Sequence, residues 1–148
     1  MSIDSVYNAK ILDYAGNIGR IGRLEAPNGT AKAHSKLCGS TVVVDVIQQN
    51  GRVSDYAQDV KACALGQASA AILAKNVIGC TLDELKLVRQ QMLAMLREEG
   101  PPPDGKFEEL KFLEPVRDYR ARHASTMLPF DAVVSAMEQA LDKQDELA

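Results

Sequence analysis

Two cysteines stand where a thiol can do chemistry. Cys38 lies on a predicted turn just before a strand, and Cys63 lies at the start of a predicted helix rich in small residues. The free N–H groups and the dipole at a helix N-terminus stabilise a thiolate, which binds soft metals, holds iron–sulfur clusters or accepts sulfur. Gly39 and Gly66 leave the nearby backbone open to an approaching group. Plain packing is the competing interpretation, because cysteine is among the most buried residue types.

The third cysteine and the two histidines give weaker signals. Cys80 precedes a helix and has no sequence neighbours of ligand type, which favours a structural role. His34 lies four residues before Cys38. An extended chain at about 3.3 Å per residue would place the two about 13 Å apart, too far to share one ion. His123 lies where a loop enters the final predicted helix, so its imidazole is a candidate ligand, a helix cap or a solvated side chain.

Three arginines stand close to His123 in the sequence. Arg117, Arg120 and Arg122 could stabilise a thiolate or sulfide, or could dock an acidic partner. A solvated loop face is the interpretation that we favour. Other reaction classes are poorly supported, because the chain has no G-x-S-x-G nucleophile elbow and the glycines at 16–22 do not follow the dinucleotide-binding pattern.

The elements that must position these residues are a helix, a sheet and a further set of helices. Residue spacing predicts a short helix over 5–14, strands over 30–36, 41–48 and 52–60, helices over 62–78, 81–100 and 125–141, and a shorter helical segment at 107–113. The sequence thus predicts an α+β fold in which a small antiparallel three-stranded sheet carries helices on one face.

Short motifs mark where the predicted elements begin and turn. Asn50 and Gly51 suit a two-residue type I′ hairpin turn between the two longest strands. Thr81 and Glu84 form a predicted capping box at a helix start. Pro129 is expected within about the first turn of the last helix, where a proline costs least.

Composition narrows the class of protein. The chain has 148 residues, of which 46% are hydrophobic and 25% are charged, and a formal net charge of −3. These values predict one globular domain over residues 1–148 and argue against a general nucleic-acid binder. No apolar run approaches the ~20 residues that a membrane span needs, and the start shows no secretory signal. An odd, small number of cysteines does not suit a disulfide scaffold, so we expect a reducing cytoplasm.

Three stretches form a more specific pattern: LCGS at 37–40 leading into the strand at 41–48, VKACALGQASA at 60–70, and GCTLDE at 79–84. They resemble, in that order, the Cys-Gly-Asp turn, the Gly-Cys helix start and the Gly-Lys-(Ser/Thr)-Leu-Asp-Glu helix opening of the U-type iron–sulfur cluster assembly scaffolds. That family comprises IscU, the N-terminal domain of NifU, and SufU. The resemblance spans roughly residues 7–141 and implies a SufE/NifU-like fold.

The chain differs from the family at two ligand positions. Ser40 stands where the family has an Asp, so an anionic ligand is missing. The third family cysteine is also missing, and different alignments put either Ser125 or His123 in its place. We favour His123, because imidazole can replace a thiolate on iron or zinc whereas a hydroxyl is a poor ligand. The resemblance thus implies a site for iron or a cluster at Cys38, Cys63 and His123.

The function that the resemblance implies is not enzymatic. The protein would be an iron–sulfur cluster assembly scaffold or carrier that receives sulfur from a cysteine desulfurase and passes a cluster to recipient apo-proteins. A cluster normally has four protein ligands, so a homodimer could share one between two copies. One alternative is a SufU- or SufE-like sulfur acceptor in which Cys63 takes a persulfide, with zinc at Cys38, Cys63 and His123. Another is a diverged, metal-free interaction module. None of these involves nucleic acid or a membrane.

Overall fold

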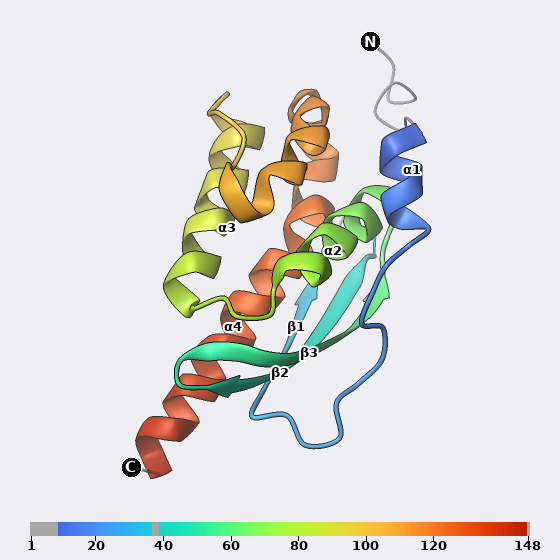
Figure 1. Cartoon of the computed structure of the whole chain (residues 1–148). Helices are drawn as coiled ribbons and strands as arrows, with labels where there is room; N and C mark the ends of the chain where they lie inside the picture. The colour runs from blue at the N-terminus through green and yellow to red at the C-terminus, as the bar shows by residue number, and fades with distance from the viewer. Residues whose placement is uncertain (1–8, 37–38, 148) are drawn as a thin grey trace.

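The structure is a computed structural model that describes residues 9–36 and 39–147. In chain order it contains helix α1 (Ala9–Ala15), strands β1 (Gly29–His34), β2 (Thr41–Gln49) and β3 (Arg52–Lys61), helices α2 (Ala64–Asn76) and α3 (Leu82–Arg97), the 3₁₀ segments η2 (Gly105–Asp118) and η3 (Arg120–Arg122), and helix α4 (His123–Leu147). The strands form one antiparallel sheet in the order β1-β2-β3, with the helices on one face (Figure 1). The predicted α+β fold is confirmed. The predicted N-terminal helix corresponds to α1, and residues 5–8 lie outside the described part.

The hairpin between β2 and β3 forms at the predicted turn. Gln49 pairs with Arg52, and the two residues between them have φ values of 55° at Asn50 and 79° at Gly51. A type I′ turn requires positive φ at both central positions, which Asn-Gly adopts readily. The turn therefore sets the pairing of Gln48 with Val53 and of Gln49 with Arg52, and an irregularity between Ile47 and Gln48 shifts the register of the rest of the two strands.

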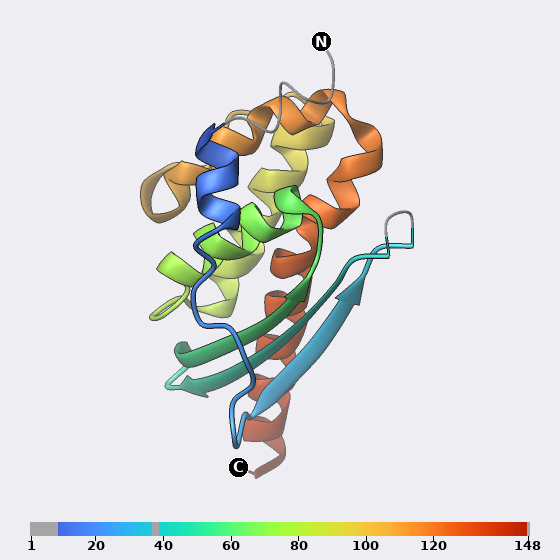
Figure 2. The same ribbon diagram turned by 90° about the vertical axis from the view of Figure 1, so that its right-hand side faces the viewer.

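The two faces of the sheet are covered by different parts of the chain. Val42, Val44 and Val46 of β2 are fully buried and face the helices. Asp45, between them, is also fully buried, but its side chain points to the opposite face because successive strand residues alternate. The loop at residues 16–28 crosses that face and passes the edge of β3 (Figure 2). The sheet is thus enclosed by helices on one side and partly by a loop on the other.

Asp45 holds that loop in place. Arg23 donates two hydrogen bonds to its carboxylate, of 2.7 and 3.1 Å, and the Leu24 N–H and the Thr30 hydroxyl donate two more, of 3.0 and 2.7 Å. Burial disfavours the charged form, but these hydrogen bonds outweigh it and hold the pKa of Asp45 below its usual range. The buried charge is therefore fully partnered.

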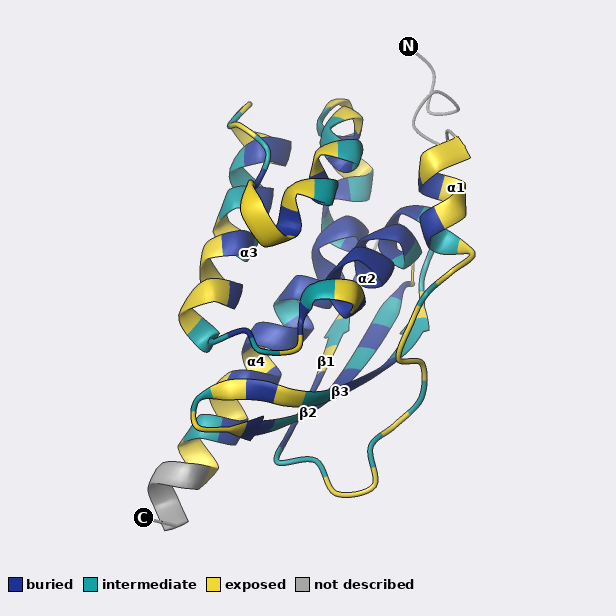
Figure 3. Cartoon of the chain, in the orientation of Figure 1, coloured by how far each residue is buried: buried dark blue, intermediate teal, exposed yellow. Residues whose placement is uncertain are grey.

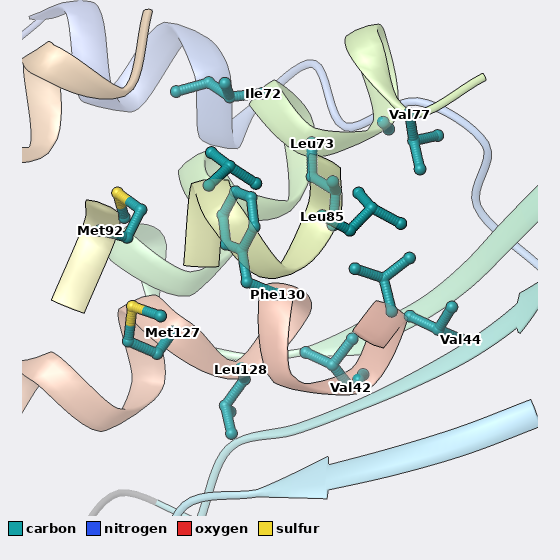
Figure 4. Close-up of a cluster of buried hydrophobic side chains, with 14 of the residues drawn as sticks. Val42, Val44, Ile72, Leu73, Val77, Leu85, Met92, Met127, Leu128 and Phe130 are labelled. Carbon is teal, nitrogen blue, oxygen red and sulfur yellow. The ribbon is translucent and has the colours of Figure 1, made fainter. Parts of the chain in front are cut away.

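The apolar core lies between the sheet and helices α2, α3 and α4. Figure 4 shows Phe130 of α4 among side chains from α2 and α3, with the valines of β2 beneath them. Most residues of α2 are buried, as the dark blue ribbon in Figure 3 shows, because α1, α4 and η2 pack against it. Its many alanines allow these close approaches. Gly29 does the same for β1, since a Cβ there would lie 2.0 Å from the Ala136 carbonyl oxygen of α4.

Helix α3 begins at the predicted cap. The Thr81 hydroxyl oxygen accepts a hydrogen bond of 3.2 Å from the Glu84 N–H, and the Glu84 carboxylate accepts one of 3.3 Å from that hydroxyl. The helix buries Leu85 and Met92 against the core and leaves Leu87 exposed. It therefore packs with one face only, in contrast to α2.

Two elements differ from the sequence-based prediction. The segment expected at 107–113 is part of the longer 3₁₀ segment η2. Helix α4 begins at His123 rather than Ser125, so Pro129 lies in its second turn and not its first. Proline has no N–H to offer the carbonyl four residues earlier, and the Ser125 carbonyl is therefore left without its helical hydrogen bond. Within the described residues, neither α4 nor another helix is long and apolar enough to cross a membrane.

Candidate functional site

Cys63 lies at the N-terminus of α2, as the sequence predicts. It is the N-cap residue, with extended backbone angles of −67° and 171°, and its side chain makes no capping hydrogen bond. The residue is partly exposed. Its Sγ lies 3.4 Å from the Oγ of Ser125 in the first turn of α4. Cys63 is thus half-buried, and a hydroxyl is the polar neighbour of its thiol.

The close approach of α2 and α4 brings these two side chains together. A Cβ on Gly66 would lie 3.0 Å from the Ser125 carbonyl oxygen and 2.8 Å from the Ala62 Cβ, so this contact requires glycine. The same carbonyl is the one that Pro129 deprives of a helical hydrogen bond, because Pro129 carries no N–H. Gly66 and Pro129 therefore shape the backbone on either side of the Cys63–Ser125 contact.

Cys38 lies outside the described residues, so its side chain cannot be placed. The register of the sheet does place the connection that carries it. His34 pairs with Thr41, and Thr41 pairs with Lys61, so the β1–β2 connection leaves the sheet at the same end as the chain leading into Cys63. Gly39 in this connection has a φ of 71°, a backbone conformation that favours glycine.

His123 is held by η2 and not by Cys63. Its ring is 5% exposed, and its Nε2 lies 3.0 Å from the Val116 carbonyl oxygen and 3.1 Å from that of Arg117. Since carbonyl oxygens only accept, Nε2 carries the proton and donates to both. Residues two apart on an α-helix point about 200° apart, so His123 and Ser125 face opposite sides of α4. The arrangement favours Ser125, and not the preferred His123, as the neighbour of Cys63.

The structure explains Cys80 as a packed thiol. It is fully buried, its Sγ donates to the Asn76 carbonyl oxygen at 3.3 Å, and the Lys106 Nζ lies 3.5 Å away. Burial raises the pKa of the Cys80 thiol, although the Lys106 ammonium opposes this. Sequence reasoning missed Lys106, which approaches from η2 and gives no local signal.

Sequence reasoning also missed a basic hollow beside α4. A pocket of about 440 Å³ is lined by Leu96, Arg97, Arg117, Arg120, His123 and Ala124. The Arg117 guanidinium donates to the Met95 and Gly100 carbonyl oxygens at 3.1 and 3.3 Å. The sequence places Arg117 and Arg120 close together near His123. It gives no signal for Arg97, which comes from α3.

The described residues do not form a complete metal site. Across residues 9–36 and 39–147, no three His, Cys, Asp or Glu side chains converge so that they could hold a metal ion. The donors that do meet are the Cys63 thiol and the Ser125 hydroxyl. The one suits soft metals and iron–sulfur clusters, while the other is a poor ligand for either. The thiol and the hydroxyl do not by themselves complete a metal site.

Comparison with known proteins decides the family. The model of the NifU-like N-terminal domain matches residues 6–125. The chain belongs to the NifU-like N-terminal domain family. A curated relative, the iron–sulfur cluster assembly scaffold protein IscU of Thermotoga maritima, is 23% identical over 139 residues, which cover 94% of this chain and 97% of that protein.

Solved structures support the same family. The crystal structure of the N-terminal part of a nitrogen-fixing NifU-like protein from Brucella abortus is 55% identical, with a TM-score of 0.92 and coverage of 95% of this chain and 98% of the other. A proposed iron–sulfur cluster assembly scaffold of the SUF system from Fervidobacterium islandicum, FiSufU, shares the fold, with a TM-score of 0.84, 19% identity and coverage of 92% and 99%. The resemblance to NifU, IscU and SufU inferred from the sequence is confirmed.

Proposed function

We propose that this NifU-like domain is a scaffold or carrier that binds iron or a transient iron–sulfur cluster and passes it to recipient apo-proteins. The observation that supports it most is the free, half-buried Cys63 at the N-terminus of α2, in a chain whose relatives include a named cluster assembly scaffold. A thiolate at a helix N-terminus is stabilised by the helix dipole and remains open to an incoming metal. Sulfur would come from a cysteine desulfurase in the cytoplasm.

The proposed ligands are the thiolates of Cys38 and Cys63, with Ser125 at the third position. The His123 Nδ1 could bind an ion while Nε2 keeps the Val116 and Arg117 carbonyls, but His123 and Ser125 face opposite sides of α4, and it is Ser125 that contacts Cys63. Two thiolates do not complete the four ligands of a stable cluster, so two copies of the domain would share one. Because Ser40 supplies no anionic ligand, the ligand set stays incomplete, and an incomplete set makes the cluster easy to release. Easy release suits a carrier.

The alternative of a zinc-dependent sulfur acceptor has less support. A zinc site at Cys38, Cys63 and His123 needs three protein ligands and one open position. It would require His123 to turn from η2 towards α2, which breaks two hydrogen bonds of a buried ring. The first proposal requires no such rearrangement of the described residues.

Anaerobic reconstitution with iron and sulfide tests the proposal. We expect the wild type to gain charge-transfer absorption and bound iron, and Cys63→Ser and Cys38→Ser to lose both. Cys80→Ala is the matched control, because it removes a thiol that lies away from the proposed ligands. A wild-type protein that takes up neither iron nor sulfide would refute the scaffold, and zinc alone by elemental analysis would favour the sulfur acceptor.

A further inference from the structure

The basic hollow brings together side chains that are far apart in the sequence. Arg97 is the last residue of α3, Arg117 belongs to η2, and Arg120 begins η3. Each guanidinium is a permanent cation with donors arranged to match the oxygens of a carboxylate or phosphate. The three cations line one concave surface although they come from three elements. Like charges that are close together repel one another, and a bound anion would offset this cost in free energy.

Internal partners do not account for these charges. Within the described residues, Arg97 and Arg120 have no ion pair, and Arg117 has a long one, 3.8 Å to Glu114. The dipole at the C-terminus of α3 explains a basic residue at position 97. It does not explain Arg120. The adjoining hollow shares Arg97 and Arg117 and adds Glu98, Glu99 and Asp118, whereas the lining of the hollow that contains Arg120 and His123 includes no carboxylate side chain.

His123 adds a second, independent feature at the same pocket. Its Nε2 donates to two carbonyl oxygens, so in the neutral ring Nδ1 is a hydrogen-bond acceptor. No described residue donates to Nδ1, and the residue as a whole is 5% exposed. Nδ1 is also not among the unpartnered polar atoms sealed from solvent, a group that in the described part holds Ser69 Oγ alone. Because Nδ1 is neither sealed from solvent nor bonded to a described donor, it can accept a hydrogen bond from a ligand in the pocket that His123 lines.

We propose that this pocket binds a small polyvalent oxyanion that also carries a hydroxyl group, such as a hydroxy-polycarboxylate or hydrogen phosphate. The oxyanion pairs with Arg97, Arg117 and Arg120, and the hydroxyl donates to His123 Nδ1. A concave pocket of about 440 Å³ suits a small molecule, since it can surround the ligand and reach the buried ring. The inference concerns the side of α4 away from Cys63 and does not depend on cluster binding.

Calorimetric titration of the full chain with citrate tests the pocket. Tricarballylate, which is citrate without its hydroxyl group, is the paired probe. Inorganic phosphate is the third. Loss of one charge-assisted guanidinium contact should weaken citrate binding about tenfold in Arg120→Gln. Arg122→Gln is the matched control, because it removes the same charge two residues away and outside the pocket lining. Tricarballylate should bind the wild type more weakly than citrate.

His123→Lys examines the hydroxyl contact. Its ammonium can still donate to the η2 carbonyls but has no acceptor for the citrate hydroxyl, so citrate and tricarballylate should bind this variant equally. The proposal is refuted if neither citrate nor phosphate binds at millimolar concentration, or if Arg122→Gln weakens binding as much as Arg120→Gln. Equal binding of citrate and tricarballylate by the wild type, or tighter binding of an oligoglutamate peptide than of citrate, would also overturn it.

Discussion

The two sides of the first turn of α4 face different surroundings. On one side, Ser125 lies against Cys63, where Gly66 allows two helices to approach closely. On the other side, His123 is bound to carbonyl oxygens at the end of η2 and lines a pocket with Arg120. The first side is close-packed around a thiol, and the second is open and positively charged.

This difference shows how strongly a site depends on helical phase. A shift of two residues in an alignment turns a side chain by about 200°, from one side of the helix to the other. Ligand chemistry favours His123 over Ser125, since an imidazole is the better ligand. Position favours Ser125, because it already contacts the Cys63 sulfur. A choice based on residue type alone therefore selects the residue on the wrong side of α4 for contact with Cys63.

The largest expected effect comes from separating α2 from α4 on the Cys63 side. Gly66→Val places a branched side chain where even a Cβ would lie 3.0 Å from the Ser125 carbonyl oxygen. Overpacking of this kind should lower the free energy of unfolding by about 2–3 kcal/mol, measured by urea denaturation. Gly19→Val is the control, because a Cβ at that exposed site meets nothing within 4 Å. Equal stability of the two variants would mean that the close contact is unimportant.

Exchanging single residues for cysteine distinguishes the two sides directly. Ser125→Cys puts a third thiol next to Cys63, and a reconstituted cluster should then dissociate about tenfold more slowly, equivalent to 1.4 kcal/mol. His123→Cys puts the same thiol on the opposite side and should leave the dissociation rate unchanged. The rate at which the charge-transfer absorption disappears in the presence of a chelator gives the dissociation rate of the cluster in each variant. A larger effect from His123→Cys would show that His123 holds the third ligand position.

The smallest expected effect concerns the segment that holds His123. Glu109 of η2 accepts hydrogen bonds from the Tyr14 hydroxyl and from Lys75 Nζ, and these lower the pKa of Glu109. A carboxylate whose folded pKa lies below its unfolded value of about 4.3 stabilises the fold above that pH and loses its contribution as the pH falls through the folded pKa. Glu109→Gln should therefore cost about 0.5–1.5 kcal/mol at pH 7 and less in acid.

Urea denaturation between pH 3 and 7 measures this difference. Glu108→Gln is the control, because Glu108 is exposed and has no ion pair among the described residues. A destabilisation by Glu109→Gln that stays constant over the whole range would contradict an electrostatic role for Glu109.

Much of the fold could be predicted because its signals are local. Asn50 and Gly51 adopt the positive φ that their types favour, and Thr81 caps α3 at the expected place. The 3₁₀ segment η2 could not be predicted in this way, since its residues carry no strong period and are held by contacts such as that of Glu109 with Tyr14.

The candidate site was predictable in part. Cys63 stands out because small residues follow it and mark a helix start. The contact between Cys63 and Ser125 depends on how α2 and α4 pack, which no local pattern encodes. The convergence of Arg97 with Arg120 likewise depends on tertiary structure, because the two come from separate elements. Cys38 stays a prediction, since it lies outside the described residues.

The outer edge of β3 has a consequence for how two copies could meet. Gln58 exchanges backbone hydrogen bonds with Arg20 and Gly22, and Val53 does so with Gly79 and Cys80, all at 2.8–2.9 Å. A strand edge whose amides and carbonyls are already occupied cannot accept a neighbouring strand. A partner strand therefore cannot pair along the whole length of β3, because Val53 and Gln58 are already bonded within the subunit.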